Sequence, residues 1–470
     1  MRNQVPLTII YHLLLFSMTC YACAFQGSDQ SLEIAQSNET ASEQTDASAL
    51  ASIRQSAHKL SGAANDYDPL MKMIGDARFV LLGEATHGTH EFYRERALIT
   101  RRLIEEKGFD AVVLEADWTD AFRANEFVQG ASKDQNAEQS LAGFTRFPQW
   151  MWRNTDVEAF TSWLKRHNEG RPQDEMAGFY GLDLYSMAAS MEAVLAHVGR
   201  GDDPLAADVR RNYACLQPYA DEPADYAADV LRPRFDTCED EVAAVLKALR
   251  ERGAPGREDA HFDAVQNARV VAGSERYFRS QAQGTESSWN LRDRHMFETL
   301  LALLEVRGPD AKAVVWAHNS HVGHAAATEM GERGETNIGE LARKHFGDAA
   351  RLVGFGTDRG TVMAASRWDG PPEVRTVRPS LPESYGALFR EVGPERFLLD
   401  LRQPALRQAL RPMRPQRAIG VLYLPETERM SHYFDAALPD QFDAFVFLEE
   451  TRAVTPVTAA QGLPHDHPFA

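Results

Sequence analysis

Short apolar runs alternate with longer amphipathic segments along most of this chain. Between residues 77 and 115, one apolar run ends at Gly83, a segment of roughly helical period follows, and a second run covers 111–114. This order predicts a strand, a helix and a strand, a unit long enough for a right-handed parallel crossover. Further strands are predicted at 178–183, 313–317, 351–356, 361–365, 397–401, 419–424 and 444–447.

The remaining segments carry helical patterns. Helices are predicted at 49–61, 117–129 and 155–167, the last opened by a capping box of Thr155 and Glu158. The link at 357–360 is typical of a hairpin turn, which makes the sheet mixed.

The fold class is therefore α/β, with a mixed, largely parallel central sheet flanked by helices. From 186 to about 306 nearly every segment is helical, which predicts an inserted all-helical subdomain over the C-terminal edge of the sheet. The predicted parts are a first core half at 49–185, a helical cap at 186–308 and a second core half at 309–470.

Acids and histidines follow the apolar runs at the points where strands are predicted to end. These residues are Glu84, His87, Glu115, Asp183, His318 and His321. The carboxyl ends of parallel strands share one edge of a sheet, and ligands of open α/β sheets bind at that edge. We therefore expect these side chains to meet in one site.

One arginine interrupts an apolar helix face. Phe92, Arg96, Ile99 and Leu103 follow a spacing that places them on the same face of the predicted helix. A buried guanidinium needs a carboxylate or a ligand, unless its aliphatic stem carries the charge outward. Because Arg96 lies near the helix end that faces the sheet edge, we place it in the site.

Two kinds of chemistry fit these residues, and the sequence alone does not separate them. In the first, His87 is a general base toward water, and Glu84 or Glu115 orients its ring. Arg96 and the two later histidines would then stabilise an oxyanion at an acyl carbon. In the second, a metal-dependent hydrolase of an amide, peptide or other ester uses zinc or manganese to generate hydroxide. Its ligands would be Glu84, His87, Glu115, His318 and His321.

A non-catalytic binding protein is a third hypothesis, although binding does not call for so many titratable groups at one edge. Aromatic residues crowd the stretch 144–152, as is typical of a core or of an apolar ligand wall. Trp150 and Trp152 are the candidates for such a wall. Asp183 and His90 complete the predicted substrate contacts, although a lone histidine such as His90 is also typical of a satisfied structural group.

Composition and missing motifs narrow the function further. The chain has 470 residues and a formal charge of −18, which argues against nucleic-acid binding, because that calls for basic patches. It contains no G-x-S-x-G elbow, no H-E-x-x-H helix and no P-loop. A serine nucleophile of the α/β-hydrolase kind is therefore not predicted.

The first residues have the pattern of a targeting segment. Arg2 precedes an apolar region, and the A-x-A site at 22–24 predicts a signal peptide over 1–24. Lipidation at Cys20 or Cys23 and a single uncleaved anchor are the alternatives. Residues 25–48 have the composition of a disordered tether.

Export agrees with the use of cysteine. Cys215 and Cys238 are the pair left after signal cleavage, and we expect them to form a disulfide between successive helices. No later run approaches the length of a membrane span, so no integral membrane segment is predicted after cleavage. The predicted location is periplasmic or secreted.

Taken together, several motifs resemble the erythromycin esterase family. They are Gly83-Glu-Ala-Thr-His-Gly-Thr-His-Glu-Phe92 with Arg96, Leu114-Glu-Ala-Asp117, Trp316-Ala-His-Asn-Ser-His321, Ser431-His-Tyr-Phe434 and Phe445-Val-Phe447. The resemblance covers most of the chain after the signal peptide. It implies a small-molecule substrate, an ester or a macrolide lactone, and with it antibiotic inactivation.

The same resemblance implies hydrolysis by an activated water, with no covalent enzyme intermediate, no cofactor and no required metal. It also implies that His87 is the base. The residues that match functional positions of the family are Glu84, His87, Arg96, Glu115, His318 and His321.

Overall fold

The computed structural model of the chain describes residues 46–199, 203–220, 222–252, 258–284 and 287–457. The predicted signal peptide at 1–24 and most of the predicted tether at 25–48 lie outside these residues. The chain divides into two units, Met1–Ala47 and Ser48–Ala470, and the sheet and its helices belong to the second. Within the described residues, no helix is both long and apolar enough to cross a membrane.

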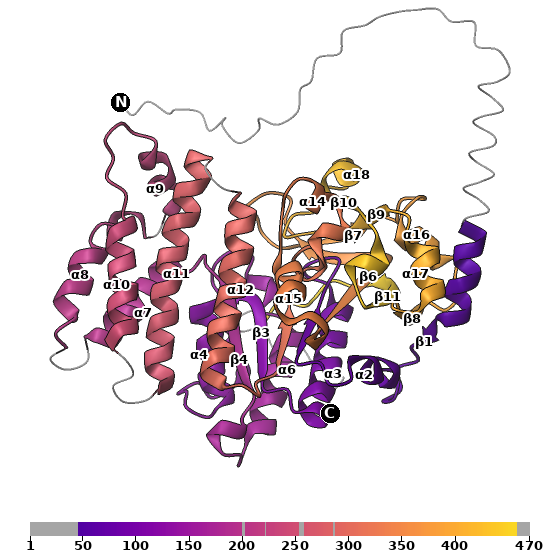
Figure 1. Cartoon of the computed structure of the whole chain (residues 1–470), viewed down its shortest axis with the longest axis horizontal. Coiled ribbons are helices and arrows are strands. Elements are labelled where there is room, and N and C mark those ends of the chain that lie inside the picture. Colours follow the sequence, from indigo (N-terminus) through magenta and orange to yellow (C-terminus); the bar gives the residue numbers. More distant parts are fainter. Residues whose placement is uncertain (1–45, 200–202, 221, 253–257, 285–286, 458–470) are drawn as a thin grey trace, which may run out of the picture. The chain divides into compact units, whose positions relative to one another are not determined.

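A nine-stranded sheet runs through the second unit (Figure 1). Six consecutive strands are parallel, in the order β4, β3, β5, β2, β6, β11, with β4 at one edge of the sheet. β8 and β1 continue the sheet beyond β11 in antiparallel fashion, and β7 pairs antiparallel with the end of β6. The sheet is mixed and largely parallel, as predicted. The strands are β1 (His58–Lys59), β2 (Phe79–Leu82), β3 (Ala111–Asp117), β4 (Gly178–Asp183), β5 (Ala313–Trp316), β6 (Ala350–Ala364), β7 (Glu373–Val377), β8 (Arg396–Asp400) and β11 (Ala444–Thr451).

The register of the three central strands aligns the carboxyl ends of β2 and β5 with Leu114, near the end of β3. Leu82 of β2 lies opposite Trp316 of β5, and Trp316 lies opposite Leu114 of β3. The residues that follow these three positions therefore emerge together at one edge of the sheet. This alignment places the polar residues after each strand in the same region.

The central strands are buried on both faces, which explains why their sequences are continuous apolar runs. In β2, Leu82 belongs to the hydrophobic cluster on one face and Leu81 to the cluster on the other. The first face is covered by α2 (Asp68–Ile74), α3 (His90–Lys107), α4 (Trp118–Val128), α5 (Ala137–Ser140) and α6 (Thr155–Asn168). The second is covered by α12 (Ser288–Arg307), α15 (Ile338–Phe346), α16 (Tyr385–Arg390) and α17 (Pro404–Leu410).

Short elements complete the second core half. A two-stranded antiparallel ribbon is formed by β9 (Arg414–Arg417) and β10 (Tyr433–Ala436). The short helices are α13 (Asn319–Val322), α14 (Glu329–Glu332), α18 (Glu428–Ser431) and α19 (Leu438–Gln441).

The segment between β4 and β5 is helical, as the sequence predicted (Figure 1). Its helices before α12 are α7 (Met187–Val198), α8 (Ala206–Tyr213), α9 (Pro223–Val230), α10 (Glu239–Arg252) and α11 (Glu258–Gln283). These five helices share a hydrophobic cluster of their own. α12, by contrast, buries its apolar residues against the sheet. We use the name cap for α7 to α11, and the domain boundaries at 186 and 308 stay predictions.

Cys215 and Cys238 form a disulfide, with 5.8 Å between their Cα atoms. The prediction that they lie in two successive helices is wrong. Cys215 follows α8, Cys238 directly precedes α10, and α9 lies between them. The bond therefore closes a loop that contains α9.

Four local predictions were also wrong. β6 is one strand of 15 residues without a hairpin at 357–360, because it pairs with β11 as far as Gly360 and with β7 from Gly360 onward. Residues 419–424 make only isolated bridges. The N-cap of α6 is Asn154, whose side chain accepts two backbone N–H groups. The helix predicted at 49–61 covers 46–56, since residues 58–59 pair with β8.

Candidate active site

His87, Glu84 and Arg96 form a buried chain of contacts just beyond the end of β2. Glu84 Oε1 lies 2.8 Å from His87 Nδ1, and Glu84 Oε2 accepts a hydrogen bond of 2.8 Å from Arg96 Nη2. Gly83 permits this turn, because a Cβ there would collide with the Asn319 side chain. The acid that orients His87 is therefore Glu84, one of the two predicted alternatives.

Arg96 supports Glu84 from inside the protein. Its side chain is fully buried, and its guanidinium lies over the rings of Tyr93 and Trp316 at 4.5 and 5.1 Å. It does not line the cleft described below. The expectation that Arg96 contacts an oxyanion is thus wrong, because the α3 face that carries it is turned into the core. Arg96 instead fixes the position of Glu84 through this charge-assisted hydrogen bond.

The contact with Glu84 determines which nitrogen of His87 is free. A carboxylate that is paired with Arg96 acts as an acceptor, so Nδ1 carries the proton and donates it to Glu84. Nε2 is then left with a lone pair. This nitrogen lies 4.0 Å from Glu115 Oε1, and both residues line the cleft. His87 therefore has the arrangement of a general base.

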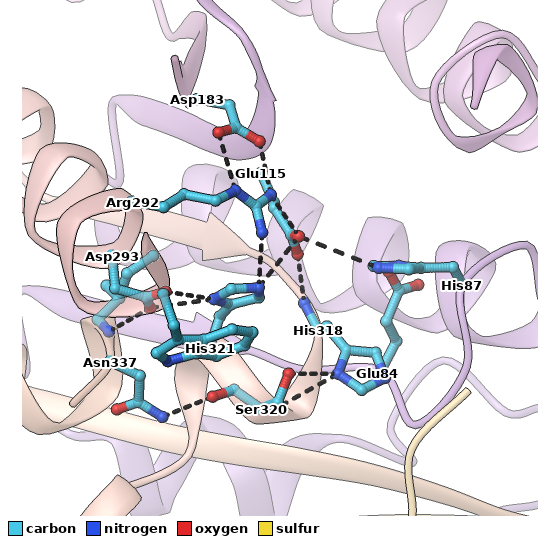
Figure 2. Close-up of polar contacts among 12 residues, drawn as sticks. Glu84, His87, Glu115, Asp183, Arg292, Asp293, His318, Ser320, His321 and Asn337 are labelled. Atoms are coloured by element: carbon cyan, nitrogen blue, oxygen red, sulfur yellow. Dashed lines mark hydrogen bonds and ion pairs between the residues drawn. The ribbon is translucent and has the colours of Figure 1, made fainter. Parts of the chain in front are cut away.

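Glu115 lies at the centre of the polar cluster (Figure 2). Its Oε1 lies 2.9 Å from Arg292 Nη2 and 3.3 Å from His321 Nε2. Its Oε2 accepts a hydrogen bond of 2.9 Å from the backbone N–H of His318. Burial alone would raise the pKa of Glu115, but the charges of His321 and Arg292 hold it well below its usual range. Glu115 is therefore ionised.

A second histidine also has an acid behind it. Asp293 lies 2.9 Å from His321 Nδ1, and the Trp289 ring stacks on the imidazole with 4.3 Å between centroids. Burial opposes the charged form, but Asp293 and Glu115 raise the pKa of His321 to about 9. The charged form of His321 is therefore favoured, and its Nε2 lies 3.3 Å from Glu115 Oε1 and 3.1 Å from Arg292 Nη1.

His318 is held differently from His321. Its Nδ1 accepts the backbone N–H of Ser320 at 3.2 Å and lies 2.8 Å from Ser320 Oγ, so the proton is on Nε2. Nε2 donates to the carbonyl oxygen of Ala85 at 3.2 Å. Burial and the neighbouring His87 lower the pKa of His318 to about 3. Both ring nitrogens are occupied, so its backbone N–H is the group that reaches Glu115.

Three residues of the site were not predicted from the sequence, and α12 brings all three to the sheet edge: Trp289, Arg292 and Asp293. Arg292 binds Asp183 through Nε at 3.0 Å and Nη2 at 2.6 Å, and it also contacts Glu115 (Figure 2). A signal was present in the sequence. Asp293 shares one helix face with Met296, Leu300 and Leu304, the same interruption of an apolar face that identified Arg96.

A cleft of about 770 Å³ opens between the sheet edge and the cap. Catalytic candidates that line it are His87, Glu115, Arg292, His318 and His321. Aromatic residues that line it are Phe144, Phe147, Trp152, Tyr185, Tyr277, Phe278, Trp289 and Trp368. The cap contributes lining residues from α11 and from the first residues of α9. The site is thus built from segments more than two hundred residues apart in sequence.

The predicted substrate contacts divide into two groups. Asp183 and Trp152 line the cleft, where Asp183 is bound by Arg292 and Trp152 donates its indole N–H to the Glu115 carbonyl at 3.2 Å. Trp150 and His90 do not line it. Trp150 is buried in the core, and His90 Nδ1 contacts Asp156 at 2.8 Å. For these two residues the alternative prediction, a structural role, agrees with their positions.

The donor atoms of the predicted metal ligands are already in use. Nδ1 of His87 is bonded to Glu84, both nitrogens of His318 have partners, and Glu115 faces a guanidinium. Across the described part of the chain, no group of three or more His, Cys, Asp or Glu side chains is arranged to hold a metal ion. The side chains present therefore do not fit the metal alternative, and we derive no step through a metal.

Comparison with known proteins relates this site to a family. The sequence profile described as erythromycin esterase matches residues 104–451, well over half of the chain. The chain belongs to the erythromycin esterase family. The match begins inside α3, so it includes Glu115, His318 and His321, while Glu84, His87 and Arg96 precede it.

The sequence relatives are distant. Erythromycin esterase type II from Escherichia coli is 29% identical over 120 residues, which cover 26% of this chain and 26% of that protein. The matched part thus spans about a quarter of that relative. The putative hydrolase YbfO of Bacillus subtilis is 20% identical over 416 residues, which cover 83% of this chain and 87% of YbfO.

Solved structures share the fold. A succinoglycan biosynthesis protein has a TM-score of 0.72 at 22% identity and covers 87% of this chain and 98% of its own. A mutant of the erythromycin esterase EreC in its open conformation has a TM-score of 0.60 at 17% identity and covers 83% and 95%. At these identities the structures establish the fold alone. Membership of the family supports hydrolase activity on a small molecule.

Proposed function

We propose that this chain hydrolyses a carboxylic ester or lactone with a water molecule activated by His87, without a covalent enzyme intermediate. One observation carries the proposal. The Glu84–His87 pair leaves Nε2 unprotonated and 4.0 Å from the Glu115 carboxylate in a cleft that holds two further cations. A base that shares a cleft with fixed cationic hydrogen-bond donors is an arrangement suited to ester hydrolysis by water.

In the proposed first step, His87 Nε2 takes a proton from water while the water oxygen bonds to the acyl carbon. Glu84 then stabilises the resulting imidazolium through Nδ1. The negative charge on the former carbonyl oxygen is stabilised by the Arg292 guanidinium and the His321 imidazolium. In the second step the acyl C–O bond breaks, and His87 returns the proton to the leaving oxygen. The products are a carboxylic acid and an alcohol.

Macrolide lactones are the proposed substrate class, and antibiotic inactivation is the proposed consequence. Family membership and the name of the relative from Escherichia coli support this choice. The cleft volume of about 770 Å³ is in the range of sites for drug-sized molecules. A mass-spectrometric screen of macrolides and simple esters tests it, since hydrolysis adds the mass of one water.

We also propose that the chain is exported and loses residues 1–24. The pattern at the N-terminus and the Cys215–Cys238 disulfide support export, because such bonds persist in oxidising compartments. The intact mass of the protein from the periplasmic fraction should be that of the chain without its first 24 residues, less the two hydrogen atoms lost when the disulfide forms. Full-length, reduced protein found in the cytoplasm would contradict this.

The decisive variant is His87→Asn, which keeps a hydrogen bond to Glu84 but removes the base. We expect kcat to fall by about a thousandfold or more, because general-base catalysis contributes roughly 10²- to 10⁴-fold. Near-normal turnover by the folded variant would exclude the role of His87. Circular dichroism and thermal unfolding confirm that the variant is folded.

Ser320→Ala is the matched control for a covalent mechanism, because Ser320 Oγ also lines the cleft beside a histidine nitrogen. We expect it to retain kcat within about tenfold, since no step is assigned to its hydroxyl. An acyl-enzyme detected by mass spectrometry would favour a serine nucleophile.

The metal hypothesis is tested by measuring ester hydrolysis after treatment of the protein with a chelator. Loss of activity that zinc or manganese restores would favour that hypothesis instead.

A further inference from the structure

Trp368 is a large apolar side chain in an unusual position. Its exposed fraction is 62%, and it lines the mouth of the cleft, in the connection between β6 and β7. Its ring lies against Phe147, with 5.1 Å between ring centroids and 56° between the ring planes. Phe147 also lines the cleft and packs on the buried Trp150. An exposed aromatic residue thus extends a buried aromatic cluster into the cleft.

A tight turn presents Trp368 to the cleft. The backbone N–H of Gly370 donates to the carbonyl of Arg367 at 3.0 Å, which closes a four-residue turn around Trp368 and Asp369. Asp369 has a positive φ of 54°, a conformation that residues other than glycine rarely adopt. Such conformations persist where the surrounding structure enforces them, and they gather at ligand-binding sites. The turn therefore fixes Trp368 in place.

Backbone hydrogen bonds tie this turn to His87. Just before the turn, Ala365 N–H donates to the carbonyl of Val421 at 3.0 Å. Ile419 lies two residues before Val421, and its carbonyl accepts the N–H of His87 at 2.9 Å. Gly420 lies between these two contacts, and a Cβ there would be 4.0 Å from the His87 ring. The position of Trp368 relative to the base is thus set by the backbone.

Single exposed apolar residues are common and usually need no explanation. Leu231, Val374 and Met430 are exposed to 63%, 64% and 81%, and none of them lines the cleft. Trp368 differs because it lines the cleft, contacts a second aromatic lining residue and sits on a constrained turn. These three observations point to a contact with substrate.

We propose that Trp368 and Phe147 form a stacking platform on which an apolar ring of the substrate packs at a distance from its ester group, and a flat aromatic ring is the simplest probe of it. The two rings present an aromatic surface at the mouth of the cleft, and the reacting carbonyl lies at its floor beside His87. A substrate that reaches both must carry a ring apart from its ester group. This inference rests on the proposed function, since it describes the specificity of the same site.

The test compares two esters that differ in the ring, 2-naphthylmethyl acetate and methyl acetate. For the naphthyl ester, Trp368→Ala should raise KM roughly tenfold and leave kcat within about twofold, because loss of aromatic stacking weakens binding by about that factor. For methyl acetate, kcat/KM should not change. Trp368→Phe should restore most of the affinity. An equal effect on both esters, or no effect on either, would overturn the platform.

A ligand that binds but cannot be hydrolysed tests the platform independently of the proposed hydrolase function. The probe is 2-naphthylmethyl methyl ether, which carries the ring but no scissile carbonyl, and its binding is followed by calorimetry. Wild-type protein should bind it about tenfold more tightly than Trp368→Ala, whether or not any ester is cleaved. Val374→Ala, an equally exposed site on β7, should bind like wild type. Equal binding by Trp368→Ala and wild type would exclude the platform even if esters are hydrolysed.

Discussion

At the scale of single residues, the site repeats one arrangement around Glu115. His87 and His321 each have an acid at Nδ1, Glu84 and Asp293 respectively, and both turn Nε2 toward Glu115 Oε1. Their surroundings differ. Arg96 pairs with Glu84 behind His87, whereas Asp293 and Glu115 raise the pKa of His321 to about 9. His87 is therefore the proposed base, and His321 is the cation.

Substitution of Arg96 tests the importance of its buried contact with Glu84. We expect Arg96→Ala to destabilise the protein by about 3–5 kcal/mol, because it leaves the Glu84 carboxylate buried without its cation. Urea unfolding measures the free energy. Activity should also fall through kcat, since His87 loses its orienting acid. Arg102→Ala in the same helix is the control, because Arg102 pairs with the exposed acids Asp68 and Glu106.

Arg102→Ala should lower the free energy of unfolding by less than about 1 kcal/mol and leave kcat unchanged. Equal effects of the two substitutions would contradict the role given to Arg96.

At the scale of elements, parallel register and helix faces assemble the site. β2 and β5 end in register with Leu114 of β3, so the turns after β2 and β5 and the last residues of β3 bring Glu84, His318 and Glu115 to one place. α3 and α12 lie on opposite faces of the sheet, and in each a charged side chain of the site interrupts an apolar face, Arg96 in α3 and Asp293 in α12. The disulfide closes the loop that holds α9, whose first residues line the cleft. Elements on both faces and in the cap thus define one cleft.

At the scale of the whole molecule, buried charges make stability depend on pH. The pKa of His321 is raised to about 9, above its ordinary value of 6.5. Its stabilising contribution is therefore complete below about pH 6.5 and is lost as the pH rises through 9. The pKa of His318 is lowered to about 3, so its contribution is lost as the pH falls from 6.5 toward 3. Because His321 loses its contribution above pH 6.5 and His318 loses its contribution below it, the two histidines favour a maximum of stability near pH 6.5.

We expect the free energy of unfolding to fall by about 3 kcal/mol between pH 6.5 and 9.5, as the shift of His321 requires. Urea unfolding at several pH values measures this slope. His321→Gln should be less stable at pH 6.5 and should lose most of the alkaline slope. An unchanged slope in that variant would show that another group causes it.

The sequence by itself determined which residues meet at the sheet edge. Continuous apolar runs mark buried parallel strands, and such strands deliver the residues after them to one edge, so Glu84, His87, Glu115 and the two later histidines could be predicted. The helical period likewise placed Arg96 on an inner face. The short apolar run at Gly178–Asp183, which is bounded by turn residues, was also correctly predicted as a strand.

Only the tertiary structure decided how these residues work. Which oxygen reaches which nitrogen depends on register and rotamer, and these choices make His87 a free base while both nitrogens of His318 are occupied. Arg292 and Trp368 come from segments whose place at the cleft follows from long-range packing of α12 and of the β6–β7 connection. Local patterns carry no signal for that packing, because it depends on partners hundreds of residues away.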